Sequence, residues 1–311
     1  MIMNGLELAE AFWWERGYPA LCELMDDAID RVAAGMVGEG SECFGFDDRY
    51  SRDHHWGPAF CLWLTADDMH TWAAPLQKLY TSLSKEGFGG FDPRIDDEMS
   101  ATRVGVQSIP TFYHRHLGVS DTPPDLSVWR TIPEESLAVA TNGKVFVDRL
   151  GEFSRIRDEL LRYYPEELRL RRLADGCFKA ARSGQYNLAR ARKRDHVVTS
   201  FGSLARFIDE MTRAIYTLNR CYRPFYKWAH QGLRMLPRSG AVMAESIEHL
   251  LALWAHTSGK PNKQMLQQVD DCALLLVDEL LSEGLTDERE PWLLSHCDKI
   301  MLHIDGISCK G

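Results

Sequence analysis

The sequence predicts an α+β chain, with a mixed-sheet N-terminal part followed by an all-helical C-terminal part. Short apolar runs typical of strands occur only before Gly151, where they alternate with helical patterns. From Phe153 to about Leu302 the apolar residues recur at helical spacing alone. Gly151 suits a connecting loop at this change of pattern. We therefore predict two domains, 1–151 and 152–311.

The N-terminal part begins with helical patterns at 6–15 and 19–33, which lead directly into a Gly-Ser turn. An apolar strand is expected at Phe60–Leu64, and a helix follows at Ala66–Ser84. A second strand is expected at Arg103–Ile109. These elements alternate as in a mixed sheet covered by helices.

Two segments of this part are expected to be loops, Gly87–Arg94 and Ser120–Pro133. A short helix is expected to start at Thr131–Glu135, because Pro and acidic residues suit the first turn of a helix. The apolar run Val145–Val147 indicates a further strand. The helical part then divides into segments near 153–163, 165–182, 186–193, 197–221, 223–235, 241–257, 262–282 and 288–303.

Composition and charge indicate a globular protein. Of the 311 residues, 45% are apolar and 26% are charged, so disorder is not expected. The net charge of −9 argues against general binding of nucleic acid, although a local basic patch is compatible with it. The eight cysteines include no Cys-x-x-Cys pair, which excludes zinc-ribbon and thioredoxin-like motifs. Neither a signal peptide nor an apolar run near the ~18 residues of a membrane span is recognised, so we expect a soluble, cytoplasmic protein with reduced thiols.

The stretch Gly38–Leu64 carries the clearest chemical pattern, a Gly-Ser turn followed by an acidic loop and an apolar strand. A small turn at the start of a helix lets backbone N–H groups approach phosphate closely, and the helix terminus favours an anion. Gly40 and Ser41 are therefore predicted to bind a triphosphate. Residues i and i+2 of a strand point the same way, so Asp53 and His55 would face a divalent metal together. Such a metal orients the phosphates and neutralises their charge.

Each of these residues also has a structural alternative. Gly40 and Ser41 could form a simple helix-capping turn. Asp53 could be an ordinary aspartate at the end of a strand. His54 is expected to pack or to form a hydrogen bond, since its side chain would point away from Asp53.

The loop before the apolar strand contains further polar residues. Asp47 and Asp48 are expected to form turns rather than to bind metal, since Asp bonds to nearby backbone in turns. Arg52 is expected to pair with one of these two acids. Trp56 lies beside the predicted site, where an indole could exclude water from the metal.

The pattern of Gly-Ser, spacer and acidic strand resembles the nucleotidyltransferase superfamily. More closely, the chain resembles an uncharacterised nucleotidyltransferase-like family, domain of unknown function 4037. That resemblance covers nearly the full chain and also rests on the strings Asn142–Asp148, Ser183–Asn187 and Arg223–Trp228. It implies a nucleotidyltransferase-like N-terminal domain and a helical domain that closes over the nucleotide.

The sequence departs from the superfamily at His55, where a second carboxylate is expected. Imidazole is a poor ligand for magnesium, which prefers oxygen, but a good one for manganese or zinc. The superfamily brings a third carboxylate on a later strand, so the resemblance implies Asp148 as a compensating metal ligand. The alternative is that Asp148 only caps the helix that contains Phe153.

In the helical part, the resemblance implies contacts to the nucleotide. Lys227 would contact a phosphate, and Tyr186 would face the base. The alternative is an exposed Lys on an amphipathic helix whose aromatic residues belong to the core. Other polar or aromatic residues of interest in this part are Gln185, Asn187, Arg190, Asn219 and Tyr222.

These observations favour a metal-dependent nucleotidyltransferase that moves a nucleoside monophosphate, expected to be AMP from ATP, onto an acceptor. Asp53 and Asp148 would be its catalytic carboxylates, and together with His55 they would bind magnesium or manganese. The acceptor is open, with a small molecule favoured over RNA or protein, and no acid is singled out as the general base.

Two other classes of function are kept as alternatives. The first is a catalytically weak nucleotide-binding sensor or antitoxin-like interaction protein that kept the fold, which His55 favours. The second is an interaction scaffold whose helical half forms a homodimer. Metal preference separates an active site from a relic, because a site with an imidazole ligand should work better with manganese than with magnesium.

Overall fold

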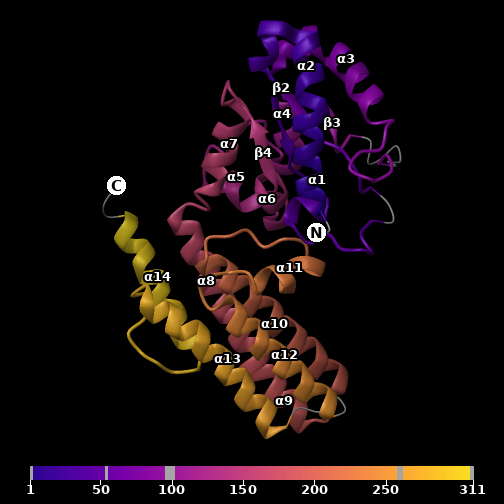
Figure 1. Ribbon diagram of the computed structural model, residues 1–311. Helices are drawn as coiled ribbons and strands as arrows, with labels where there is room; N and C mark the ends of the chain where they lie inside the picture. Colours follow the sequence, from indigo (N-terminus) through magenta and orange to yellow (C-terminus); the bar gives the residue numbers. More distant parts are fainter. Residues whose placement is uncertain (1–2, 53–54, 95–101, 258–261, 309–311) are drawn as a thin grey trace. The chain divides into compact units, whose positions relative to one another are not determined.

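The computed structural model describes residues 3–52, 55–94, 102–257 and 262–308. The chain forms two compact units, Met1–Arg162 and Tyr163–Gly311. The first contains a four-stranded mixed sheet with helices, and the second is built of helices (Figure 1). The predicted α+β class is confirmed.

The division between the units falls after helix α7, Glu152–Leu161, rather than at Gly151. Aromatic packing explains why α7 belongs to the first unit. The ring of Phe153 stacks on that of Trp63 with 3.9 Å between centroids, and the Tyr113 hydroxyl donates a hydrogen bond of 2.8 Å to the Phe153 carbonyl. The change from strands to helices in the sequence therefore precedes the end of the first core.

The sheet of the first unit has the strand order β3-β2-β1-β4. Strand β1 pairs antiparallel with both β2 and β4, and β2 pairs parallel with β3. The strands expected near 60–64, 103–109 and 145–147 are confirmed, although the second is shorter than predicted. The strands are β1 Ala33–Met36, β2 Cys61–Leu64, β3 Gly105–Ser108 and β4 Lys144–Val147.

Strand β1 lies at the centre of the sheet, and the expectation that the preceding helices lead straight into the Gly-Ser turn was wrong. Its sequence, Ala-Ala-Gly-Met, lacks the β-branched and aromatic residues typical of strands. All four residues are buried, and a Cβ added to Gly35 would lie 2.5 Å from the Lys144 carbonyl oxygen. Because β4 approaches so closely, position 35 requires a residue without a side chain. This requirement comes from the tertiary structure and not from the local sequence.

Helices before and after the strands complete the first unit. The helix predicted at 66–84 is confirmed as α3, where the Thr65 hydroxyl accepts a hydrogen bond from the Asp68 amide at 3.2 Å. The predicted loop at 120–133 contains an additional short helix, α5. The helices are α1 Gly5–Phe12, α2 Tyr18–Met25, α3 Ala66–Leu83, α4 Ile109–Leu117, α5 Leu126–Thr131 and α6 Glu134–Thr141.

The second unit confirms the predicted run of helices. Its core is formed by apolar residues that are fully buried, among them Leu173, Phe207, Met211 and Leu276. No helix in the described part of the chain is long and apolar enough to cross a membrane. The helices are α8 Glu166–Ala180, α9 Leu188–Lys193, α10 Val197–Leu218, α11 Tyr226–Leu233, α12 Gly240–His256, α13 Lys263–Ser282 and α14 Leu294–Ser308, with a π-helical turn at Ala181–Asn187.

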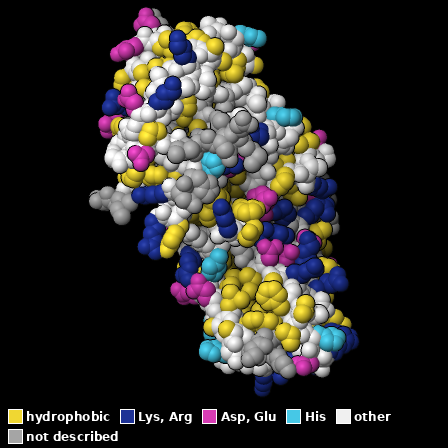
Figure 2. Space-filling model, turned by 90° about the vertical axis from the view of Figure 1, so that its right-hand side faces the viewer, with side chains coloured by type: hydrophobic (Ala, Val, Ile, Leu, Met, Phe, Trp, Pro, Cys, Tyr) yellow, Lys and Arg dark blue, Asp and Glu magenta, His cyan; other side chains and the backbone are white. Residues whose placement is uncertain are grey.

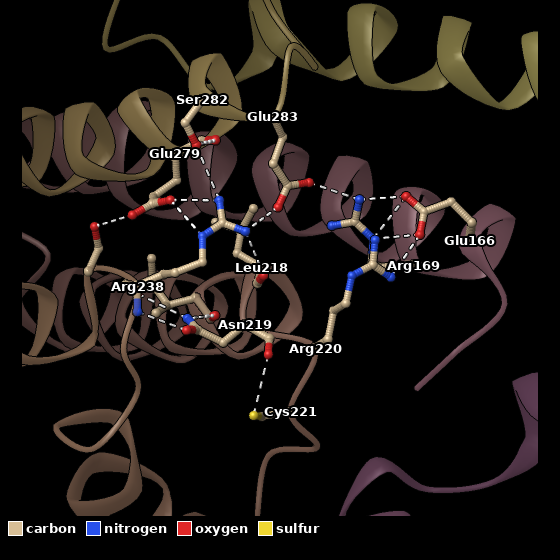
Figure 3. Close-up of polar contacts among 12 residues, drawn as sticks. Glu166, Arg169, Leu218, Asn219, Arg220, Cys221, Arg238, Glu279, Ser282 and Glu283 are labelled. Carbon is tan, nitrogen blue, oxygen red and sulfur yellow. Dashed lines mark hydrogen bonds and ion pairs between the residues drawn. The ribbon is translucent and has the colours of Figure 1, made fainter. Parts of the chain in front are cut away.

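A network of ion pairs connects helices of the second unit (Figure 3). Arg169 is 2% exposed and lies 2.6 Å from a Glu166 oxygen and 2.9 Å from a Glu283 oxygen. Arg238 pairs with Glu279 at 2.7 Å and also with Glu283. Glu283 thus joins the two arginines, so α8 and the segment before α12 are tied to the end of α13.

Hydrophobic side chains also gather on one face of the second unit, as Figure 2 shows. The exposed apolar residues of α10 and α12 include Val198, Phe201 and Leu251. Phe201 packs its ring 6.0 Å from that of Trp254. This unit therefore presents apolar surface on two of its helices.

Candidate functional site

The predicted phosphate turn follows strand β1. Ser41 caps a single 3₁₀ turn, Glu42–Phe44, without a hydrogen bond from its side chain. The amides of Cys43 and Phe44 donate to the carbonyls of Gly40 and Ser41, both at 3.1 Å. The expected helix start is thus present, but it is only one turn long and carries little of the dipole of a full helix.

The start of β2 lies at the same end of the sheet as this turn. In the antiparallel register, Gly35 pairs with Cys61, so the chain leading into β2 lies beside the end of β1. His55 precedes β2 in a bend with φ of 54°, a left-handed conformation, so the expectation that it lies on a strand was wrong. The other predicted ligand, Asp53, and its neighbour His54 lie outside the described residues.

Glu42 is a charged residue of this turn that the sequence analysis missed. A Cβ added to Gly40 would overlap its carboxylate, which therefore folds back over the turn. Arg94 donates to Glu42 at 3.2 Å, and both side chains are at most 5% exposed. Burial raises the pKa of Glu42, and the charge of Arg94 opposes that rise. The only signal in the sequence was an acid directly after the Gly-Ser pair.

The residues directly before strand β4 form hydrogen bonds with the segment that contains the Gly-Ser turn. The Asn142 amide group accepts a hydrogen bond from the Gly38 amide at 3.0 Å and donates one to the Gly38 carbonyl at 2.7 Å. The Gly143 amide donates to the Cys43 carbonyl at 2.7 Å. Gly143 has φ of +60°, which glycine adopts without strain. The Asn-Gly pair of the Asn142–Asp148 string thus positions the Gly-Ser turn.

Asp148 lies at the opposite end of the sheet. Met36 pairs with Lys144, whereas Ala34 pairs with Val147, so Asp148 follows β4 beside the start of β1. Its two carboxylate oxygens accept hydrogen bonds from the amides of Gly151 at 2.9 Å and Ser154 at 2.8 Å. The structure therefore does not bring Asp148 together with Gly40 and Ser41, and its carboxylate caps α7 instead.

Residues of the acidic loop hold that loop against the N-terminus. Asp48 accepts hydrogen bonds from the amides of Tyr50 and Ser51, which confirms the predicted turn. Asp47 instead accepts from the Gly5 amide at 2.8 Å and the Trp56 indole at 3.1 Å.

The expected ion pair of Arg52 with Asp47 or Asp48 was wrong. Its guanidinium donates to the Met3 carbonyl at 3.1 Å and lies 4.4 Å from the Trp56 ring centroid, so within the described residues it pairs with neither Asp47 nor Asp48. Trp56 is 9% exposed and packs beneath this loop.

The predicted nucleotide contacts of the helical part belong to the second unit. Tyr186 is 49% exposed, and its hydroxyl accepts a hydrogen bond from Arg190 at 2.8 Å. Lys227 is exposed on α11, with its ammonium 4.3 Å from the Trp228 ring centroid. Both side chains are accessible to a ligand from solvent.

Three other polar or aromatic residues of this unit have structural roles. Gln185 donates to Asp270 and to the Pro291 carbonyl and accepts from the Leu293 amide. Tyr222 packs 4.9 Å from the ring of Tyr163. The side chain of Asn219 bonds the carbonyls of Ile215 and Arg238 and the amide of Arg238.

The donor set in the described residues does not assemble a metal centre. No group of three or more His, Cys, Asp or Glu side chains in this part of the chain is placed to hold a metal ion. Glu42 is paired with Arg94, and Asp148 is bonded to two amides. Of the other predicted ligands, Asp53 lies outside the described residues, and His55 does not have the strand conformation from which its pairing with Asp53 was predicted.

Comparison with known proteins gives one match. Residues 129–229 match the model of a family described as Domain of unknown function (DUF4037). The match confirms the predicted resemblance to DUF4037. It includes all three further strings and the residues Asp148, Tyr186 and Lys227, but it does not include the stretch Gly38–Leu64. The description of DUF4037 carries no activity, and no curated protein or solved structure matches the chain.

Proposed function

We propose that the chain is a nucleotidyltransferase that binds a nucleoside triphosphate at the Gly40-Ser41 end of the sheet. One observation supports this most directly. The register around β1 brings the Gly-Ser turn and the segment leading into β2, which contains His55, to the same end of the sheet. This is the order of phosphate turn and ligand segment that phosphoryl transfer requires.

Particular groups at the turn suit a phosphate. The Ser41 hydroxyl has no hydrogen-bond partner among the described residues, so it can donate to a phosphate oxygen. Arg94 lies at the turn, where its charge balances that of the Glu42 carboxylate. A divalent metal held by Asp53 and His55 would supply the remaining positive charge when bound.

The reaction would transfer a nucleoside monophosphate, AMP where the substrate is ATP, and release pyrophosphate. We propose a small-molecule acceptor, as predicted from the net charge, and a cytoplasmic location. A homodimer through the helical unit is compatible with the exposed apolar residues of α10 and α12.

A second candidate is a nucleotide-binding protein without turnover. Two observations favour it: Asp148 caps α7 at the far end of the sheet, and the Glu42 carboxylate covers Gly40. With His55 in place of an acid, Asp53 would then be the single carboxylate among the predicted ligands that is left for a metal.

Calorimetric titration with ATP tests this proposal. The purified chain is titrated in manganese, magnesium or chelator, together with the variants Ser41→Ala and Asp53→Asn. Pyrophosphate release is followed in parallel, with a panel of hydroxyl-bearing small molecules added as acceptors. Asp148→Asn is the matched control, because it changes a carboxylate that caps a helix.

We expect metal-dependent binding that Asp53→Asn abolishes and Ser41→Ala weakens, with pyrophosphate release faster in manganese than in magnesium. Asp148→Asn should bind as the unmodified chain does. Binding without pyrophosphate release in the presence of these acceptors would support the second candidate, and no binding in any metal would refute both.

A further inference from the structure

The second unit contains a cavity of about 670 Å³ that the proposed nucleotidyl transfer does not use. Its wall is formed by the end of α8, the π-helical turn Ala181–Asn187 and the first half of α10. Its volume lies within the range of small-molecule sites in proteins. The lining residues are Phe178, Lys179, Arg182, Ser183, Asn187, Thr199, Gly202, Ser203, Arg206 and Glu210.

Three cations line this cavity. Arg206 is exposed and forms no hydrogen bond or ion pair within the described residues. Arg182 lies with its guanidinium 5.3 Å from the ring centroid of Phe178, which leaves its N–H groups open to a ligand. Lys179 pairs with Asp175 at the surface, where both side chains are about half exposed. The cavity therefore holds at least two guanidinium groups that form no ion pair with a carboxylate of the described residues.

Neutral hydrogen-bonding groups lie between these cations. Asn187, Thr199 and Ser203 form no side-chain hydrogen bond within the described part of the chain. Ser183 donates its hydroxyl proton to the Lys179 carbonyl at 2.7 Å, so only its lone pairs face the cavity. Hydroxyl and amide donors beside guanidinium groups are the donor set that binds phosphate oxygens.

One acid lines the cavity. Glu210 pairs with Arg213 at 3.2 Å and is 12% exposed. Burial raises the pKa of Glu210, and the charges of Arg213 and Lys179 oppose that rise. The cations thus outnumber the acids at this site.

The surrounding sequence is basic, although the whole chain has a net charge of −9. Between Phe178 and Phe207 there are seven Lys or Arg residues and a single acid, Asp195. Local charge of this kind attracts anions towards the cavity. All lining residues also fall within the segment 129–229 that matches DUF4037.

We propose that this cavity binds the phosphate group of a small phosphorylated organic molecule. Arg206 and Arg182 contact the phosphate oxygens, and Asn187, Thr199 and Ser203 donate further hydrogen bonds. Phe178 provides an apolar surface for the organic part of the ligand. This inference goes beyond the proposed nucleotidyl transfer, because every residue that carries it belongs to the second unit.

A substitution at Gly202 can test the cavity without removing a charge. It lies inside α10, and a Cβ added to it would meet no atom within 4 Å. A leucine at this position would therefore project into the cavity without a clash of its Cβ, and it suits a helix better than glycine does. Gly202→Leu thus reduces the space for a ligand while the fold is retained.

The experiment is calorimetric titration of the full chain with ribose 5-phosphate at low salt, with ribose as the uncharged probe. The variants are Arg206→Ala, Gly202→Leu and, as the matched control, Arg192→Ala, which removes an exposed arginine of α9 outside the cavity. Circular dichroism melting checks that each variant is folded. A single-stranded RNA oligonucleotide is titrated in a separate arm.

We expect ribose 5-phosphate to bind at one site and ribose not to bind. Arg206→Ala should weaken binding at least about tenfold, since a charge-assisted hydrogen bond is lost, and Gly202→Leu should abolish it. Arg192→Ala should leave this affinity within twofold.

Three outcomes would overturn the proposal: no saturable binding of ribose 5-phosphate, unchanged binding in both cavity variants, or equal weakening by Arg192→Ala and Arg206→Ala. Binding of the RNA without binding of ribose 5-phosphate would also overturn it, because the ligand would then be a nucleic-acid backbone. A failure of ATP binding in Asp53→Asn has no bearing on these outcomes, so the two proposals fail separately.

Discussion

Burial controls the titration of several side chains in the first unit. Burial raises the pKa of the Cys61 thiol to about 12 and that of the Cys43 thiol well above its usual value. Cys43 lies in the turn itself, and Cys61 pairs with Gly35 in the sheet beside it. Neither thiol is ionised at neutral pH. Thiolate chemistry at this turn is therefore not expected.

His116 gives the first unit a predictable dependence on pH. Burial lowers the pKa of this histidine to about 4, and its ring packs 4.9 Å from the ring of Phe112. In the unfolded chain the pKa is about 6.5, so the folded state favours the neutral ring. The stability that the neutral His116 ring contributes is therefore complete above pH ~6.5, and it is lost as the pH falls towards the pKa of the folded state.

We predict that the denaturant midpoint of the first unit decreases between pH 6.5 and pH 4, and that His116→Asn reduces this decrease. His114→Asn, an exposed histidine of the same helix α4, is the control. Equal pH dependence in the chain and in His116→Asn would contradict the prediction.

At the scale of elements, strand ends decide which residues meet. Antiparallel pairing of β1 with β4 places Asn142 at the Gly-Ser turn and Asp148 at the other end of the sheet. Because the strands are only four residues long, the position of a side chain before or after its strand decides its end of the sheet. Asp148 is accordingly a helix cap.

Asp148→Ala is predicted to cost about 1 kcal/mol of stability, since the amides of the N-cap residue Gly151 and of Ser154 in the first turn of α7 lose their acceptor. Chemical denaturation measures this loss. Glu159→Ala, on the exposed side of the same helix, should change stability by less than ~0.5 kcal/mol. An unchanged midpoint in Asp148→Ala would contradict the capping role of Asp148. Loss of metal-dependent ATP binding in Asp148→Asn would support Asp148 as a metal ligand.

At the scale of the whole molecule, the chain has two compact units, and the second has a core and an ion network of its own. Arg169 is the most buried charge of that network, because it is 2% exposed between Glu166 and Glu283. Removal of one partner from a buried ion pair leaves the other charge uncompensated. Removal of Arg169 should therefore lower the free energy of unfolding of the second unit.

Arg169→Met is predicted to destabilise the second unit by about 3 kcal/mol. Hydrogen exchange should accelerate in α8 and α13 and stay unchanged in β1 and β2. Arg171→Met, which removes an exposed pair with Glu167 from the same helix, should cost less than ~0.5 kcal/mol. Similar exchange in both variants would show that the network adds no stability.

Much of the fold could be predicted because the pattern along the chain is strong. The helices from α8 to α14 and the strands β2, β3 and β4 follow apolar periodicity or apolar runs. Strand β1 could not be predicted, because its residues suit a helix as well as a strand and only pairing with β2 and β4 selects the extended form.

The candidate site was predicted in part. The Gly-Ser turn and its place beside the chain leading into β2 follow from the order of residues. The roles of Glu42, Arg94 and Asn142 do not, because their partners are far away in the sequence or depend on how the turn folds back.

The sequence by itself determined the α+β class, the run of helices after Gly151 and the resemblance to DUF4037, because periodicity and short motifs are local properties of the chain. Only the tertiary structure decided which end of the sheet each residue occupies, which carboxylates are already bonded, and that Arg206 of α10 lines one cavity together with Lys179 and Arg182. Register and burial are set by pairing between distant segments, and no single stretch of sequence contains both partners.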